Sequence, residues 1–221
     1  MRAFINAIRV PSFVLASLAA VFCFTGASAN ETRLLRFPDI HQDRLAFTYA
    51  GDIWTVSANG GDAVRLTSHP GVEAFPKFSP DGKWIAFTGQ YEGEDQVYLM
   101  PAGGGEPRQL TFYPARGPLT SRWGVDNQVQ GWARDGKSVL FRSLRDHFNA
   151  AQSQLYKVSI DDSAVQALAP PLAGSGALSP DGASLLYSPL TRDFRTWKRY
   201  QGGWAQDLWI YNLAQNTARN I

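Results

Sequence analysis

Three side-chain patterns in this sequence contain residue types that could support chemistry. The first is the set of histidines, His41, His69 and His147, which could bind a metal or act as general bases. None of them stands at metal-ligand spacing from another histidine or from a cysteine, so no metal site is predicted. We expect His41 in a turn between strands, with a structural hydrogen bond. We expect His147, which follows Asp146, in a solvated loop.

The second pattern is rich in glycine. A nucleophile elbow needs the spacing G-x-S-x-G after a strand, and Gly174-Ser175-Gly176 lacks it. Gly103-Gly104-Gly105 opens no helix with Lys and Ser or Thr, so it predicts no phosphate site. The Asp-Gly pairs lack the regular acidic ladder of a calcium loop and predict hairpins. We therefore expect no catalytic residue, no metal and no cofactor in this chain.

The third pattern consists of two loops in which cationic and aromatic residues crowd together. The candidates are Arg195, Trp197, Lys198 and Arg199 in one loop, and Arg116 and Arg122 in the other. Such side chains can hold the carboxylates and apolar side chains of peptides. The sequence therefore offers a candidate peptide-contacting surface. The alternative is that the aromatic rings pack the loops onto the fold and the charges are solvated.

The N-terminal segment has the order of a secretory signal peptide. Arg2 and Arg9 form a positive region, residues 10–24 are mostly apolar, and Ala27-Ser28-Ala29 is a cleavage box. The apolar run is shorter than the roughly 20 residues of a spanning helix, which disfavours a membrane anchor. We expect cleavage after Ala29 and no stable membrane insertion afterwards. The mature chain would be secreted across the inner membrane and be periplasmic or extracellular.

Charge and cysteine content narrow the partners of the mature chain. The whole sequence has 21 Lys and Arg against 19 Asp and Glu, and loss of Arg2 and Arg9 with the signal leaves 19 against 19. A net charge of zero disfavours nucleic acid as a partner. The single cysteine, Cys23, leaves with the signal, so neither a disulfide nor a thiol site is expected.

The elements that must position any site come from a fourfold internal repeat. Three units contain an Asp-Gly turn between apolar runs, at residues 78–82, 132–136 and 178–182, and the first has His41-Gln42-Asp43 in its place. The aromatic residues that follow are Phe47, Phe87, Phe141 and Tyr187, spaced by 40, 54 and 46 residues. Asp-Gly supplies the positive φ of tight hairpins. Each unit therefore predicts four short antiparallel strands.

One four-stranded sheet cannot bury both of its faces, whereas sheets stacked around an axis can. We therefore predict an all-β fold, a β-propeller of four-stranded antiparallel blades. The expected domains are a signal peptide at 1–29 and a propeller at 30–221, with blades at about 33–68, 72–112, 128–169 and 175–221. Because Ile221 falls in the outermost strand of the fourth unit, we expect an incomplete ring. The bare apolar faces of the first and fourth units should then associate with other surfaces.

Two longer stretches resemble the tricorn protease family. Residues 38–47, Pro-Asp-Ile-His-Gln-Asp-Arg-Leu-Ala-Phe, followed by Asp52-Ile53-Trp54, are similar to the opening of that family. Residues 197–203, Trp-Lys-Arg-Tyr-Gln-Gly-Gly, followed by Leu208-Trp209-Ile210, are similar to its fourth-blade loop. The resemblance covers Glu31 to Ile221. The Ser-Pro-Asp-Gly and Leu-Thr elements are also shared by TolB-like propellers.

The resemblance implies a six-bladed propeller, of which this chain holds four blades. A seven-bladed propeller, a PDZ domain and a serine peptidase domain would follow. The propellers would handle or gate substrates, which are peptides or unfolded protein, and the other partner would be the rest of the same polypeptide. No catalytic motif of the family has a matching position here, and a homo-oligomer stays open.

Two alternatives remain. One is a TolB-like periplasmic propeller that acts as a protein-binding scaffold. The other is a propeller enzyme with its own central pocket, which ranks last because the inner strands offer few acids or histidines. They offer mainly Phe75, Lys77, Phe78, Gln130, Trp132 and Leu178.

Overall fold

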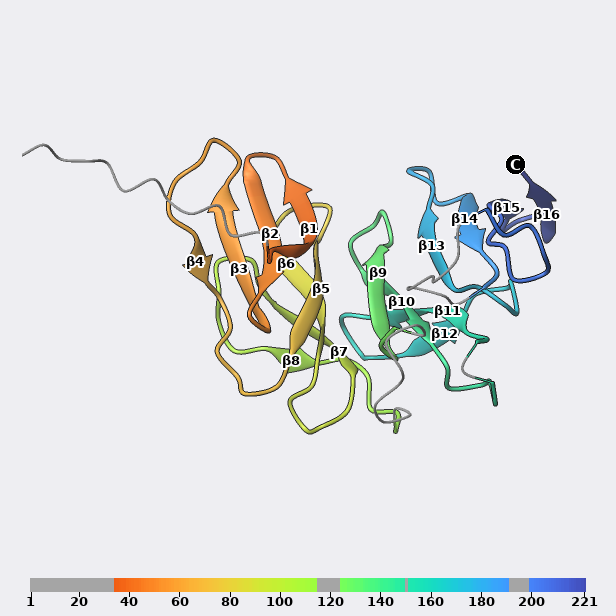
Figure 1. Ribbon diagram of the computed structural model, residues 1–221. Coiled ribbons are helices and arrows are strands. Elements are labelled where there is room, and N and C mark those ends of the chain that lie inside the picture. Colours follow the sequence, from red (N-terminus) through yellow and green to blue (C-terminus); the bar gives the residue numbers. More distant parts are fainter. Residues whose placement is uncertain (1–33, 115–123, 150, 191–198) are drawn as a thin grey trace, which may run out of the picture. The chain divides into compact units, whose positions relative to one another are not determined.

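The computed structural model describes residues 34–114, 124–149, 151–190 and 199–221. These residues form four antiparallel sheets of four strands each (Figure 1). They contain no helix, and hence no helix long and apolar enough to cross a membrane. The predicted all-β fold of four-stranded antiparallel units is confirmed. We number the sheets blade 1 to blade 4 along the chain.

In every blade the strands lie side by side in chain order. Blade 1 consists of β1 (Arg36–His41), β2 (Arg44–Tyr49), β3 (Asp52–Ser57) and β4 (Val64–Arg65). Blade 2 consists of β5 (Glu73–Phe78), β6 (Trp84–Gly89), β7 (Gln96–Pro101) and β8 (Arg108–Gln109). Blade 3 consists of β9 (Gln128–Trp132), β10 (Ser138–Ser143), β11 (Gln154–Ser159) and β12 (Val165–Ala167). Blade 4 consists of β13 (Ser175–Leu178), β14 (Ser184–Ser188), β15 (Trp209–Asn212) and β16 (Thr217–Asn220).

The Asp-Gly repeat builds the turn between the first two strands of a blade. In blade 2 the Gly82 N–H donates to the Ser79 carbonyl at 2.8 Å, and the Asp81 carboxylate accepts the Ser79 hydroxyl at 2.6 Å. Blade 4 repeats both contacts with Ser179, Asp181 and Gly182. Gly82 has a φ of +69°, so glycine carries the left-handed backbone that the turn requires. The Asp side chain instead closes the turn by hydrogen bonding.

The Leu-Thr pair after the outermost strand ties that strand to the third strand. The Thr67 hydroxyl accepts the Ile53 N–H at 2.9 Å, and Thr111 accepts the Val97 N–H at 2.9 Å. The preceding leucines continue the backbone ladder, and Leu110 is buried whereas Leu66 is partly buried. The short strands β4 and β8 are therefore held by a side chain as well as by their own backbone.

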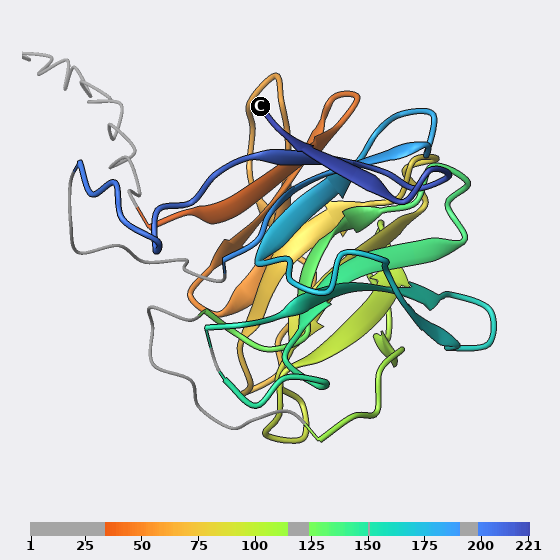
Figure 2. The ribbon, with the colours of Figure 1, turned by 90° about the vertical axis from the view of Figure 1, so that its right-hand side faces the viewer.

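The apolar core is divided into three clusters, each lying between two consecutive blades. The blades can be followed by their colours in Figure 2. The neighbours Ala86 and Phe87 on β6 show how a blade serves two clusters. Ala86 packs towards blade 3 and Phe87 towards blade 1, and both are fully buried. Burial of one such aromatic side chain contributes about 1.5–3 kcal/mol. Stability therefore comes from stacking of the blades, since no blade has a core of its own.

The stretch with the family resemblance holds blade 1 onto blade 2. Asp39 in β1 accepts the Phe78 N–H of β5 at 2.8 Å and pairs with Lys77 at 3.1 Å. Arg44 donates to the Gly82 carbonyl at 2.6 Å. The His41 ring lies so close to Gly82 that a Cβ there would collide with it. His41 is the last residue of β1, directly before the turn rather than in it. Its structural role is packing against Gly82 and not the expected hydrogen bond, which is absent within the described residues.

Candidate functional site

Most of the predicted peptide-contacting residues fall outside the described part of the chain. These are Arg195, Trp197 and Lys198 in one loop and Arg116 and Arg122 in the other. Of the six predicted residues the structure describes Arg199 alone, which is exposed and has a φ of +56°. Their role as a peptide-contacting surface therefore stays a prediction.

The histidines hold no metal-binding arrangement within the described residues, where no group of three or more His, Cys, Asp or Glu could hold an ion. His69 accepts the Gly71 N–H through Nδ1 at 2.9 Å and stacks on Tyr91, with ring centroids 4.4 Å apart. Asp146 does not pair with its neighbour His147, because its carboxylate accepts the Tyr156 hydroxyl at 2.6 Å. Both loops are thus fixed by contacts within the protein.

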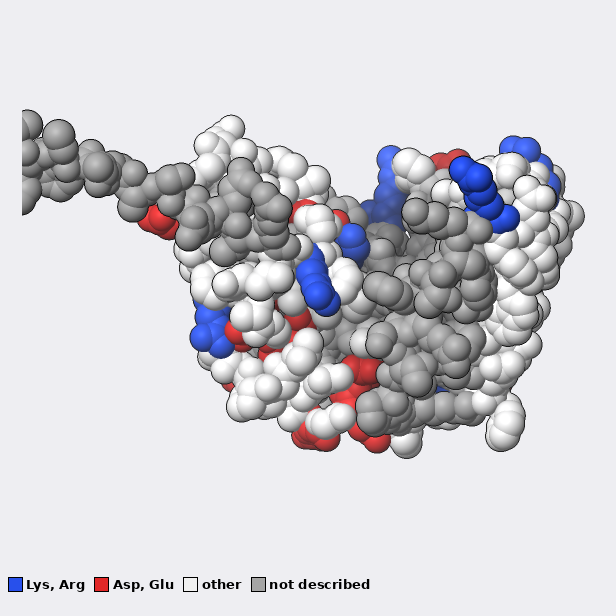
Figure 3. All heavy atoms as spheres, in the orientation of Figure 1, with Lys and Arg blue, Asp and Glu red and all other residues white. Residues whose placement is uncertain are grey.

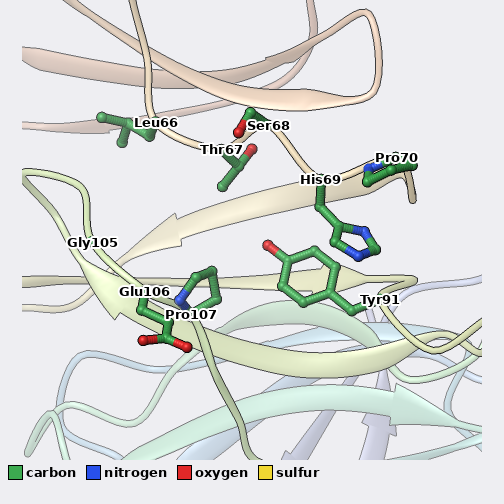
Figure 4. Close-up of a pocket in the computed structure, with 9 residues that line it drawn as sticks. All are labelled: Leu66, Thr67, Ser68, His69, Pro70, Tyr91, Gly105, Glu106 and Pro107. Carbon is green, nitrogen blue, oxygen red and sulfur yellow. The ribbon is translucent and has the colours of Figure 1, made fainter.

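A cleft of about 460 Å³ lies where the link between blades 1 and 2 meets the loops of blade 2 (Figure 4). One wall is the segment from Leu66 to Pro70, which follows β4. The opposite wall is Tyr91, from the loop between β6 and β7, together with Gly105–Pro107 before β8. Figure 4 shows the Tyr91 ring directly beside the His69 imidazole. The cleft thus combines apolar carbon with one imidazole, one phenol, the Glu106 carboxylate and the side chains of Thr67 and Ser68.

Glu73, the first residue of β5, lies behind this cleft and is fully buried. Burial raises the pKa of Glu73 to about 7, although the hydrogen bond from the Thr67 hydroxyl, at 3.0 Å, works in the opposite direction. The negative charge of Asp52 raises this pKa further, and Arg65, which pairs with Asp52 at 2.8 Å, lowers it. Burial and the nearby Glu73 also raise the pKa of Tyr91. Glu73 therefore exchanges its proton near neutral pH.

A carboxyl group with a neutral pKa is what general acid–base catalysis requires. Glu73, however, is not among the residues that line the cleft, so a ligand there could not reach its proton. Sequence reasoning missed this residue, because a glutamate at the start of a strand ordinarily indicates an exposed position. The structure supports a role for Glu73 in the junction between blades 1 and 2.

An arginine is enclosed by three aromatic rings beside blade 3. The Arg145 guanidinium lies 5.0 Å from the Tyr113 ring, 5.2 Å from Phe141 and 5.1 Å from Tyr156. Tyr113 donates its hydroxyl hydrogen to the Arg145 carbonyl at 2.9 Å. Burial lowers the pKa of Arg145. These cation–π contacts fasten the loop after β10 to the segment after β8, so the cage is occupied by the protein's own side chain.

Acidic side chains gather at the lower edge of the view in Figure 3, where the loop between β6 and β7 lies in Figure 1. This loop carries Glu92, Glu94 and Asp95. The Asp95 carboxylate has a structural role, because it accepts hydrogen bonds from the Gln90 side-chain amide at 2.7 Å and from the Asp126 backbone N–H at 3.2 Å. Burial raises the pKa of Asp95. The acidic loop is therefore partly a structural bridge to the start of blade 3.

Four-stranded sheets that follow one another in chain order and share an apolar core with each neighbour define a β-propeller repeat protein. The chain belongs to the tricorn family, because the family model described as "Tricorn protease N-terminal beta propeller domain" matches residues 32–221. The resemblance deduced from residues 38–47 and 197–203 is thereby confirmed for the N-terminal propeller region.

Named relatives agree with this assignment. Tricorn protease homolog 1 of Streptomyces coelicolor is 33% identical over 177 residues, which is 80% of this chain and 16% of that protein. A tricorn-like protease N-terminal subunit of Sulfurisphaera tokodaii is 29% identical over 168 residues, covering 75% of this chain and 80% of that protein. The crystal structure of the tricorn protease matches with a TM-score of 0.70 at 25% identity, covering 85% of this chain and 18% of that one.

The chain thus spans about one sixth of the Streptomyces relative, at 16% of its length, and most of the Sulfurisphaera subunit, at 80%. The fold is also similar to solved TolB propellers, with a TM-score of 0.62 at 21% identity for the Agrobacterium tumefaciens protein. At that identity the TolB similarity concerns the fold alone.

Proposed function

We propose that this chain is the first part of the N-terminal propeller of a tricorn-like serine peptidase, and that it handles or gates peptides rather than cleaving them. The observation that carries the proposal is the family match across residues 32–221. Peptide cleavage would then belong to other parts of the intact protein, as the resemblance implies. The alternative of a TolB-like scaffold is less favoured, because its support is similarity of fold.

The outward face of blade 4 supports the proposal that further blades complete a six-bladed ring. Leu186 on β14 is 40% exposed, whereas its equivalents Ala46, Ala86 and Leu140 are at most 1% exposed under the next blade. Leu208 is 52% exposed, whereas its equivalents Ile53, Val97 and Leu155 are fully buried. An apolar surface that is covered in every other blade is expected to be covered here too.

Ser188 stands at the position from which blades 2 and 3 bond to the next blade. Its buried hydroxyl, like that of Thr48 in blade 1, has no hydrogen-bond partner within the described residues. Thr88 at the same position of blade 2 bonds to blade 3, and Arg142 in blade 3 donates to the Gly174 carbonyl before blade 4 at 2.9 Å. In this proposal the covering blade comes from the same polypeptide or, as the separate Sulfurisphaera subunit suggests, from a second one.

We also propose that the chain is exported and that its signal peptide is removed after Ala29. This part of the proposal rests on the sequence order of residues 1–29, which lie outside the described residues. A mature N-terminus at Asn30 would place the propeller in the periplasm or outside the cell.

The peptidase assignment is tested with the natural full-length polypeptide. We expect it to hydrolyse fluorogenic peptides and to react with a fluorophosphonate probe for active-site serines. Deletion of residues 34–221 should change which peptide lengths are cleaved and leave the reaction with the probe in place. A natural polypeptide that shows neither peptide hydrolysis nor reaction with the probe would contradict the assignment and favour the scaffold.

A further inference from the structure

A second cleft, of about 510 Å³, lies between blades 3 and 4. Its apolar walls are Leu168, Leu178 and Leu213, which lie at the ends of β12, β13 and β15. Lys157 on β11 lines the same cleft. An apolar cleft of this size with a few polar groups is typical of sites for small molecules.

The cleft is present because the repeat has a small residue at Leu178. At both other junctions between blades an aromatic residue, Phe78 or Trp132, holds the equivalent position on the first strand. The Trp132 indole packs against the core between blades 2 and 3 and donates to the Lys77 carbonyl at 2.9 Å. The junction of blades 3 and 4 therefore lacks an aromatic ring that its neighbours contain.

Lys157 stands where the preceding blade has an apolar core residue. It lies opposite Leu140 in the β10–β11 register, as Leu99 lies opposite Ala86 in blade 2. Leu99 is buried in the core towards blade 3, and Leu140 is buried in the core towards blade 4. Residues paired in this way point to the same face of a sheet. The Lys157 side chain therefore points towards blade 4 and into the cleft.

The ammonium group of Lys157 has no counter-ion within the described residues, where it forms neither an ion pair nor a side-chain hydrogen bond. The residue is partly buried. Gly131, which also lies opposite Leu140, has nothing within 4 Å of the place where a Cβ would stand, so the space on this face is open. A cation among apolar side chains is stabilised when an anion pairs with it.

The other charges at the cleft belong to the two Asp-Gly turns and offset one another. Asp135 accepts the Lys137 N–H at 2.9 Å, and Asp181 is close enough to Arg134 for an electrostatic interaction. With two carboxylates at its rim, the cleft disfavours a ligand of high negative charge such as phosphate. Lys157 can compensate one negative charge, which favours a carboxylate.

We propose that this cleft binds a small carboxylic acid that carries an aromatic ring. The carboxylate pairs with the Lys157 ammonium, and the ring lies against Leu168, Leu178 and Leu213, in the volume that the Trp132 indole fills at the neighbouring junction. Pairing neutralises the cation, and burial removes the ring from water. The inference goes beyond the proposed function, because peptide handling does not require such a ligand.

Calorimetry on the natural polypeptide that contains this chain measures binding of indolepropionate and of its neutral analogue indolepropionamide. The acid is expected to bind, and the amide to bind roughly tenfold or more weakly, since it lacks the charge-assisted contact. Lys157→Met keeps the apolar stem and should weaken the acid roughly tenfold without affecting the amide. Leu178→Trp introduces the ring of the neighbouring junction and should abolish binding of both. Lys83→Met, which removes an exposed lysine of blade 2, is the matched control and should change neither affinity.

Equal affinities for the acid and the amide would overturn the proposal, and this comparison does not depend on how any variant folds. Unchanged binding of the acid to folded Leu178→Trp would place the ligand elsewhere and refute the site. The blocked peptide N-acetyl-Trp-Asp-amide is the third ligand. If it binds more tightly than indolepropionate, the assignment to a small molecule is wrong and a protein partner occupies the cleft. None of these measurements uses peptide cleavage, so their failure leaves the proposed function standing.

Discussion

The carboxylate of Asp39 in blade 1 accepts a hydrogen bond from the backbone N–H of Phe78 in blade 2, at 2.8 Å. This contact joins the innermost strands of two blades, and the same carboxylate pairs with Lys77. It gives a physical reason for the Pro-Asp-Ile-His stretch that carries the family resemblance. The stretch fixes the position of blade 1 against blade 2.

Asp39→Ala is expected to lower the free energy of unfolding by about 1–3 kcal/mol, because it removes the acceptor of a partly buried backbone N–H. Asp39→Asn keeps an acceptor and loses a half-exposed ion pair, so it should cost about 1 kcal/mol or less. Urea unfolding measures both, with an unchanged m-value as the check on two-state behaviour. Equal losses for the two substitutions would show that the backbone hydrogen bond is unimportant.

Thr88 and Thr48 offer a matched pair of substitutions. Thr88→Val leaves the Val129 N–H and the Asn127 carbonyl without their partner and should cost about 1–3 kcal/mol. Thr48→Val removes a hydroxyl that has no partner and should be neutral or stabilising. The midpoints of urea unfolding compare the two directly. A loss at Thr48 as large as at Thr88 would mean that the Thr48 hydroxyl is already bonded.

Glu73 predicts a pH dependence of stability. Its folded pKa is raised to about 7 from an ordinary value of 4.5, so the folded state holds the proton more tightly than the unfolded state. The corresponding stability is fully present below pH 4.5 and is lost as the pH rises through about 7. At about 1.4 kcal/mol per pKa unit, the loss reaches up to about 3 kcal/mol at pH 8.

Glu73→Gln should abolish most of this dependence and be more stable than the wild type at pH 8, with similar stability at pH 4.5. Asp52, Arg65 and Tyr91 also face this carboxyl group and stay unchanged in the variant. The next junction has the neutral Asn127 at the equivalent position, so it should contribute no such slope. Parallel pH profiles for the wild type and the variant would contradict the assignment to Glu73.

Mass spectrometry of the exported protein tests the predicted leader. A mature N-terminus at Asn30 is expected, since Ala27-Ser28-Ala29 has small residues where signal peptidase requires them. Ala29→Phe should block this cleavage and leave the longer chain in the cell. Export of a chain that still begins at Met1 would contradict the prediction.

Much of the fold could be predicted from the sequence, because turns and alternating apolar residues are local signals. Asp81-Gly82 marks its hairpin by backbone chemistry alone, and Phe87 marks the buried strand that follows. The contacts between blades could not be predicted in this way. Asp39 and Phe78 are 39 residues apart, and nothing in either local sequence shows that they meet. The packing of His41 on Gly82 could not be predicted for the same reason, since Gly82 lies in the next blade.

The candidate site was less predictable than the fold. The loops chosen for their arginines lie mostly outside the described residues, so their role is still a prediction. Thr48 and Thr88 have the same residue type at the same repeat position, and the bonding of their hydroxyls distinguishes them. Glu73 likewise becomes notable through its complete burial. Such differences arise from packing between blades, which is not encoded in any short stretch of sequence.

We infer that a further blade of a larger tricorn-type propeller covers the outward face of blade 4. The most direct measurement is maleimide labelling of Leu208→Cys, with Cys23 replaced by Ser, in this chain and in the natural full-length polypeptide. We expect rapid labelling in this chain and strong protection in the full-length protein. Val165→Cys, on the exposed edge strand β12, should be labelled in both. Equally rapid labelling of Leu208→Cys in both proteins would contradict the account.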